Sequence, residues 1–137
     1  MTKWIVALLV VVSLAGCKTA EPVSRPSTYS IKVGRGGGFT GMYTFYEFNN
    51  AGKILQSEEL DASGKEHKTF DKKVLDTNVD KAISNQYETV TVNDPGNFTN
   101  YMRIKYGSKV KLYKWQESSK VPEWVTDMHA EFWKLGE

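Results

Sequence analysis

Residues that could carry out acid–base or metal chemistry are few and widely spaced in this chain. The two histidines, His67 and His129, have no cysteine or carboxylate near them at the spacing of metal ligands, whereas a zinc site needs three or four converging donors. The pattern Gly-x-Ser-x-Gly, which places a nucleophilic serine on a sharp turn, does not occur. We therefore predict no catalytic residue, no metal and no cofactor, and we do not expect an enzyme.

The most unusual local composition is a glycine-rich run at residues 34–41 (GRGGGFTG). A loop that cradles phosphate needs glycines that open a helix, but this run leads into a predicted strand, so we expect no nucleotide site. Two interpretations stay open: a flexible connection between strands, or a binding loop whose exposed backbone a partner approaches closely. The binding loop would consist of Gly36, Gly37, Gly38, Phe39 and Gly41.

Cys17 is the only cysteine, so no disulfide can form within the chain. It follows a positive segment with Lys3 and an apolar stretch at residues 4–14, which is about half the length that crosses a bilayer. These features predict a signal peptide at residues 1–16. The sequence Leu14-Ala15-Gly16-Cys17 resembles the lipobox of bacterial lipoproteins. This resemblance implies cleavage before Cys17 and a diacylglycerol on its thiol.

The lipobox resemblance implies a location in the bacterial cell envelope, with the membrane as a partner through the lipid anchor. Lys18 stands where, by analogy with enterobacterial sorting, an aspartate would retain a lipoprotein in the inner membrane, and we therefore expect the outer membrane. The alternative is an ordinary secretory signal followed by an incidental cysteine. With 18 basic and 16 acidic residues, the near-neutral chain is not expected to bind nucleic acid.

The chain is expected to contain a single folded domain. Residues 17–28 combine the lipidated cysteine with two prolines and small or polar neighbours, which is typical of a flexible tether. Residues 29–137 have the length of one domain. They hold every aromatic residue of the chain except Trp4, and these side chains supply the apolar area that a small domain without disulfides needs.

Alternating and β-prone segments predict strands in this domain. Gly107-Ser108, between the last two segments, is a suitable pair for a two-residue hairpin turn. The predicted fold class is α+β, a four- to five-stranded antiparallel sheet with two helices packed on one face. The predicted strands lie at residues 29–33, 40–49, 54–60, 98–106 and 109–115.

Two segments have the period of an amphipathic helix. One lies at about residues 70–87, and the other opens at Pro122, since proline is favoured in the first turn of a helix. The residues expected on the buried faces are Leu75, Val79, Ile83 and Tyr87 in the first helix, and Trp124, Met128, Phe132 and Leu135 in the second.

Two helices on one face leave the other face of the sheet toward solvent. If the aliphatic side chains of the last two strands point to the helices, an aromatic and basic set points outward, and such side chains concentrate at interfaces. The alternative is a register shifted by one residue, in which this set forms the core. The residues expected to point outward and to bind a partner are Tyr101, Arg103, Tyr113 and Trp115.

Gly37-Gly38-Phe39-Thr40-Gly41 leads into a strand, and a hairpin, a helix, a second hairpin and a helix opened by Pro122 follow. This order resembles that of the emfourins, small bacterial inhibitors of thermolysin-type metallopeptidases whose fold is a sheet with helices on one side. The resemblance covers nearly the whole domain and implies a metallopeptidase as partner. The layout is also similar to that of uncharacterised Bacteroidetes lipoproteins, from which no activity follows.

Two functions stay open from the sequence. The first is a lipid-anchored envelope binding module for an envelope or secreted protein, and a peptidase inhibitor is one form of it. The second is a structural or accessory envelope lipoprotein without its own activity. An inhibitor should present a loop to a protease cleft, and the glycine-rich run is the candidate. An accessory protein should show an extended apolar patch, and the outer sheet face is the candidate.

Overall fold

The computed structural model describes residues 24–137. The predicted signal peptide, Cys17 and most of the predicted tether lie outside these residues. The described part is an α+β domain with an open, mostly antiparallel sheet and two helices. Its elements are β1 (Tyr29–Gly37), β2 (Met42–Asn49), β3 (Lys53–Ser57), β4 (Lys65–Thr69), α1 (Lys72–Ser84), β5 (Asn93–Asp94), β6 (Phe98–Tyr106), β7 (Lys109–Trp115) and α2 (Glu123–Gly136).

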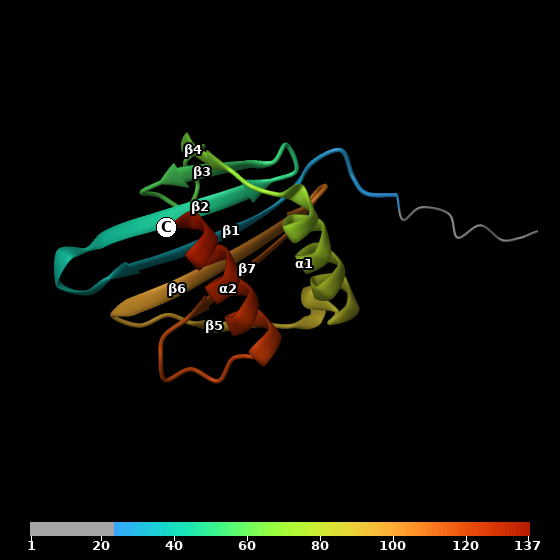
Figure 1. Cartoon of the computed structure of the whole chain (residues 1–137). Coiled ribbons are helices and arrows are strands. Elements are labelled where there is room, and N and C mark those ends of the chain that lie inside the picture. Colours follow the sequence, from blue (N-terminus) through green and yellow to red (C-terminus); the bar gives the residue numbers. More distant parts are fainter. Residues whose placement is uncertain (1–23) are drawn as a thin grey trace, which may run out of the picture.

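Strand β1 lies at the centre of the sheet, whose order is β4-β3-β2-β1-β6-β7-β5. It pairs antiparallel with β2 on one side and with β6 on the other. The hairpins β2–β3 and β6–β7 extend the sheet outward from this centre. Both helices lie on the same face of the sheet (Figure 1). The predicted α+β class is therefore confirmed.

The predicted number of strands is wrong, because the sheet within residues 24–137 has seven strands. The two strands beyond the five predicted ones form the edges: β4 pairs with β3, and the short β5 runs parallel to β7. Every residue of β4 (KEHKT) and of β5 is exposed, so neither strand has the apolar alternation that reveals a half-buried strand. Charged side chains on an edge strand also discourage pairing with other chains.

Helix α1 begins after the N-cap residue Asp71. Leu75 and Val79 are buried, as predicted, but Ile83 is 41% exposed. A spacing of four residues drifts by about 40° per step around a helix of 3.6 residues per turn, so Ile83 has rotated away from the core. Ala82 is buried in its place.

Helix α2 follows Pro122, as predicted. Met128 and Phe132 are fully buried, whereas Leu135 is 39% exposed and Trp124 is only partly buried. The buried face is therefore rotated from the one that the spacing predicted. It is completed by Val125, His129 and Gly136.

The core lies between the helices and one face of the sheet and forms a single cluster. Phe132 of α2 packs on Phe48 of β2, with ring centroids 4.6 Å apart. Tyr113 of β7 is fully buried, and its hydroxyl donates to the backbone oxygen of Tyr87 at 2.6 Å. Burial raises the pKa of Tyr113. The buried hydroxyl therefore stays neutral and has a partner, as buried polar groups require.

Residues 25–28, which the sequence assigned to the flexible tether, contact the domain. Arg25 forms an ion pair with Asp80 of α1 at 2.8 Å. The backbone oxygen of Ser27 accepts a hydrogen bond from the side chain of Asn50 at 2.8 Å. The predicted tether is therefore shortened at its C-terminal end.

Candidate functional site

The glycine-rich run is divided between a strand and a turn. Gly34 and Gly36 belong to β1, at the centre of the sheet, and both are buried. A Cβ at Gly34 would overlap the ring of Phe45, and a Cβ at Gly36 would overlap the ring of Tyr43. These glycines therefore allow two aromatic rings of β2 to lie over the backbone of β1. Gly36 is a packing residue and not part of an exposed binding loop.

The rest of the run forms the tip of the β1–β2 hairpin. Gly37, Gly38 and Gly41 have φ angles of 107°, 71° and 61°, values that L-residues with a side chain rarely adopt. Between them, Gly38–Thr40 form one 3₁₀ turn. The backbone N–H of Gly38 donates to the backbone oxygen of Asn97 at 2.7 Å. The tip is thus a defined turn that is tied to the segment before β6.

Three apolar side chains are exposed together at this tip. Phe39 is fully exposed, Met42 is 69% exposed and Phe98 is 53% exposed. Met42 of β2 and Phe98 of β6 both pair with Gly37, on opposite sides of β1. We call Phe39, Met42 and Phe98 the hairpin tip patch. It lies at the end of the sheet opposite to the end where the chain enters β1 (Figure 1).

Sequence reasoning identified Phe39 but missed Met42 and Phe98. Both lie in segments that the sequence predicts as strands, and no local feature of the sequence predicts that β6 pairs with β1. Their proximity arises only from the pairing with Gly37. One local feature could have indicated them. Met42 and Phe98 are large apolar residues at the first positions of β2 and β6, beside the glycine-rich run and the turn before β6.

The predicted outward face is correct for β6 and wrong for β7. Tyr101 and Arg103 alternate with the buried Met102 and Ile104 and lie on the face opposite the helices. Tyr113 and Trp115 were expected on the same outer face. They are instead 0% and 5% exposed, in the core, so they cannot form a contact surface for a partner.

The turn between β6 and β7 explains this correction. Gly107 and Ser108 form the two-residue turn that was predicted, and Tyr106 pairs with Lys109 across it. Counting along both strands from that pair places Met102 opposite Tyr113. Directly opposed residues share a face of the sheet. The side chain of Tyr113 therefore follows Met102 into the core.

The segment at residues 58–64, between β3 and β4, covers part of the outer face of the sheet. The Nζ of Lys32 donates to the backbone oxygens of Leu60 and Ala62 at 2.7 and 3.0 Å. Only 2% of Lys32 is exposed. Burial lowers the pKa of Lys32, although the carboxylate of Glu47, 3.8 Å from its Nζ, offsets part of this shift.

A second contact holds the same segment. Nη1 of Arg103 lies 2.9 Å from a carboxylate oxygen of Asp61. The Arg103 side chain is 8% exposed and the Asp61 side chain is 91% exposed. The ion pair therefore joins a covered arginine on the outer face of the sheet to an exposed carboxylate of the segment. Arg103, which was predicted to bind a partner, is occupied within the domain.

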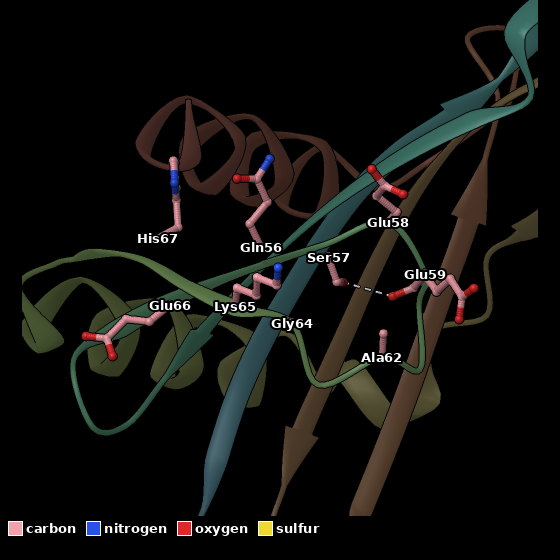
Figure 2. A pocket seen from close by; sticks show the side chains of 9 residues that line it. All are labelled: Gln56, Ser57, Glu58, Glu59, Ala62, Gly64, Lys65, Glu66 and His67. Atoms are coloured by element: carbon pink, nitrogen blue, oxygen red, sulfur yellow. Dashed lines mark hydrogen bonds between the residues drawn. The ribbon is translucent and has the colours of Figure 1, made fainter.

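A pocket of about 660 Å³ lies on the β3–β4 hairpin beside this segment (Figure 2). Figure 2 shows Glu58 and Glu59 at one end of it, and Glu66 and His67 at the other. The Ser57 hydroxyl donates to the backbone oxygen of Glu59 at 2.9 Å, so it is not activated by a base. Because these groups do not converge, we assign no reaction to this pocket.

The two histidines each contact a backbone oxygen. Nε2 of His129 lies 3.1 Å from the oxygen of Gly34, and burial lowers the pKa of His129 to about 4. The ring is therefore neutral at physiological pH. Nε2 of His67 lies 2.9 Å from the oxygen of Gly136. In the part of the chain that the structure describes, no three His, Cys, Asp or Glu residues are placed to hold a metal.

Neither the known protein families nor the curated proteins include a match to this sequence. None of the helices within residues 24–137 is long and apolar enough to cross a membrane.

Proposed function

We propose that this protein is a lipid-anchored binding module of the bacterial cell envelope that contacts a partner protein through the hairpin tip patch. The observation that carries the proposal is the exposure of Phe39, Met42 and Phe98 together at one end of the sheet. Clustered apolar side chains on the surface of a small domain mark sites that another molecule covers. Phenylalanine and methionine are among the residues that are enriched in protein interfaces relative to the rest of the surface.

Arg25, near the start of the described residues, and the hairpin tip patch lie at opposite ends of the domain (Figure 1). Cys17 and Arg25 are eight residues apart, and eight fully extended residues span at most about 28 Å. A lipid on Cys17 would therefore hold the Arg25 end close to the membrane. From Tyr29, β1 runs for nine residues toward the tip, a distance of about 30 Å. The tip patch would then face away from the membrane, where an envelope or secreted partner has access.

Inhibition of a metallopeptidase is one form of this function. A peptidase cleft accepts a large side chain that projects from a narrow loop, and Phe39 is fully exposed on a turn between Gly38 and Gly41. Because neither glycine has a Cβ, the backbone of the turn is not shielded by side chains at these two positions. The resemblance to emfourins supports this form, and an outer-membrane location, inferred from Lys18, would place the inhibitor where secreted peptidases pass.

The alternative function, an accessory lipoprotein that holds a complex through the outer sheet face, has less support. It needs an extended apolar surface on that face. Tyr113 and Trp115 lie in the core instead, and the segment 58–64 contacts Lys32 and Arg103 over the middle of the face.

The anchor is tested by metabolic labelling. In cells fed labelled palmitate, the wild-type protein should incorporate the label, and Cys17→Ser should lose it because a serine hydroxyl cannot form the thioether. The variant should also be released from the membrane or be misprocessed, with its signal peptide left uncleaved. A wild-type chain that carries no label would leave an ordinary secretory signal as the better interpretation.

The patch is tested by photo-crosslinking in the intact envelope. A benzoylphenylalanine that replaces Phe39 should give a discrete crosslinked product, which mass spectrometry identifies. The same photoreactive residue in place of Lys81, which is exposed on α1, is the matched control and should give none. Equal products from both positions would show that the tip has no particular partner.

Serine variants then measure the contribution of each side chain. Phe39→Ser and Phe98→Ser should change the free energy of unfolding by less than about 0.5–1 kcal/mol, because the side chains are largely in water. The affinity for the crosslinked partner should fall at least about tenfold. For the inhibitor form, Phe39→Ser should relieve inhibition of a thermolysin-type peptidase. A panel of such peptidases without inhibition would reject that form and leave the binding module in place.

A further inference from the structure

A second surface, separate from the hairpin tip patch, has the lining of a small-ligand site. A pocket of about 310 Å³ opens on the outer face of the sheet, between β2, β6, β7 and the start of the segment 58–64. Its volume is at the lower end of the range for small-molecule sites. Its lining combines three aromatic rings with three charged side chains: Tyr43, Phe45 and Tyr101, and Glu58, Glu59 and Lys114.

The three rings form a corner. Tyr43 and Phe45 are nearly parallel, with an angle of 9° between ring planes and centroids 6.3 Å apart. Tyr101 is turned by 69° against Tyr43 and by 61° against Phe45. Phe45 is buried at the base, but Tyr43 is 36% exposed and Tyr101 is partly exposed. Two ring surfaces of different orientation therefore remain accessible from the pocket.

Such a corner attracts positive charge. The face of an aromatic ring carries negative electrostatic potential and binds ammonium and guanidinium groups. The domain already uses this property at the base of the cluster, where the Nζ of Lys32 lies 5.9 Å from the centroid of Phe45. The charged side chains of the lining also favour a cation, because the two carboxylates of Glu58 and Glu59 outnumber the one ammonium of Lys114.

We propose that this pocket binds a small organic cation of the quaternary-ammonium type against Tyr43 and Tyr101. Glu58 and Glu59 supply the counter-charge. A methylated ammonium suits the site because its charge is spread over a large, weakly hydrated surface that contacts two rings at once. The site needs no movement of the segment 58–64, and it is independent of the proposed function of the tip.

The test uses choline and its uncharged isostere 3,3-dimethyl-1-butanol, in which carbon replaces the nitrogen. Amide chemical shifts are recorded during titration of residues 17–137 carrying Cys17→Ser, the full mature chain without its lipid. Choline should cause saturable shifts at Tyr43, Tyr101 and Glu59. The isostere should bind between about twofold and thirtyfold more weakly, which is the range of measured cation–π contributions.

Three variants separate electrostatic attraction from simple burial of the methyl groups. Tyr101→Leu keeps an apolar side chain and should weaken choline binding while leaving the weaker binding of the isostere nearly unchanged. Glu58→Gln with Glu59→Gln should also weaken choline binding. Lys114→Met should strengthen it, because the competing ammonium is removed.

Equal affinity for choline and the isostere, or no saturable shift from choline, would overturn the proposal. Tighter binding of N-acetylglucosamine at the same residues would overturn it as well, in favour of a neutral, hydroxyl-bearing ligand. A Lys114→Met variant that binds choline more weakly than the wild type would show that the charged lining does not act as proposed.

Discussion

Replacing Phe132 with alanine is expected to lower the free energy of unfolding by about 3–5 kcal/mol, as for other large buried aromatic residues. Phe132 is fully buried, and its ring contacts Phe48 at a centroid distance of 4.6 Å. Removal of the ring leaves a cavity between α2 and the sheet that neighbouring elements fill only in part. Since a small domain has about 5–15 kcal/mol of stability, this variant is close to unfolding. Urea denaturation of the unlipidated chain measures the effect.

Leu135→Ala is the matched control for this prediction. The sequence placed Phe132 and Leu135 on the same buried face of α2, but Leu135 is 39% exposed. Its truncation should therefore cost no more than about 1 kcal/mol. Similar losses in the two variants would show that the helix is rotated relative to the orientation described here.

Gly34→Ala should also destabilise the domain, by about 1–3 kcal/mol or more, although alanine is ordinarily the better residue in a strand. The new Cβ would overlap the ring of Phe45. Phe45 is 2% exposed, and its ring packs against Tyr43 and Tyr101, so it cannot move away from the new Cβ without disturbing these contacts. The strain acts on β1, the central strand. Because β2 and β6 both pair with β1, the strain reaches both halves of the sheet.

A double-mutant cycle identifies the cause. In a Phe45→Leu background the ring is absent, and Gly34→Ala should become nearly neutral. The coupling free energy between the two sites should therefore exceed about 1 kcal/mol. Gly38→Ala provides a comparison, because nothing lies within 4 Å of its Cβ position and only the φ of 71° is unfavourable. Additive effects of Gly34 and Phe45 would contradict the packing role of Gly34.

The register of β7 follows from the turn that precedes it. The two-residue turn at Gly107 and Ser108 already determines that Met102 faces Tyr113. The aliphatic character of Val110 and Leu112 predicts instead that these two side chains face the helices, but Val110 is 57% exposed. Aromatic side chains are more effective than short aliphatic ones at filling the space under a helix. Turn geometry was therefore the more reliable guide to the register.

The candidate site was predicted only in part. Phe39, Gly38 and Gly41 are at the exposed tip, as a binding loop requires, because glycine-rich sequence beside an aromatic residue is a local signal. Gly34 and Gly36 have the same local signal, yet they lie under aromatic rings. The difference depends on which side chains of β2 lie opposite each glycine, and no property of the run itself specifies that.

Local sequence was enough to predict the α+β class, the approximate positions of both helices and the two-residue turn of the last hairpin, and it also predicts a lipid anchor at Cys17. These features depend on neighbouring residues: the period of apolar side chains, the φ preferences of proline and glycine, and a short contiguous motif. Tertiary structure alone decided the seven-strand order, the rotation of each helix on the sheet, and the assembly of Phe39, Met42 and Phe98 into one patch. The physical reason is that a strand's period of two fixes which residues share a face, whereas strand pairing across distant parts of the chain decides which residues lie side by side.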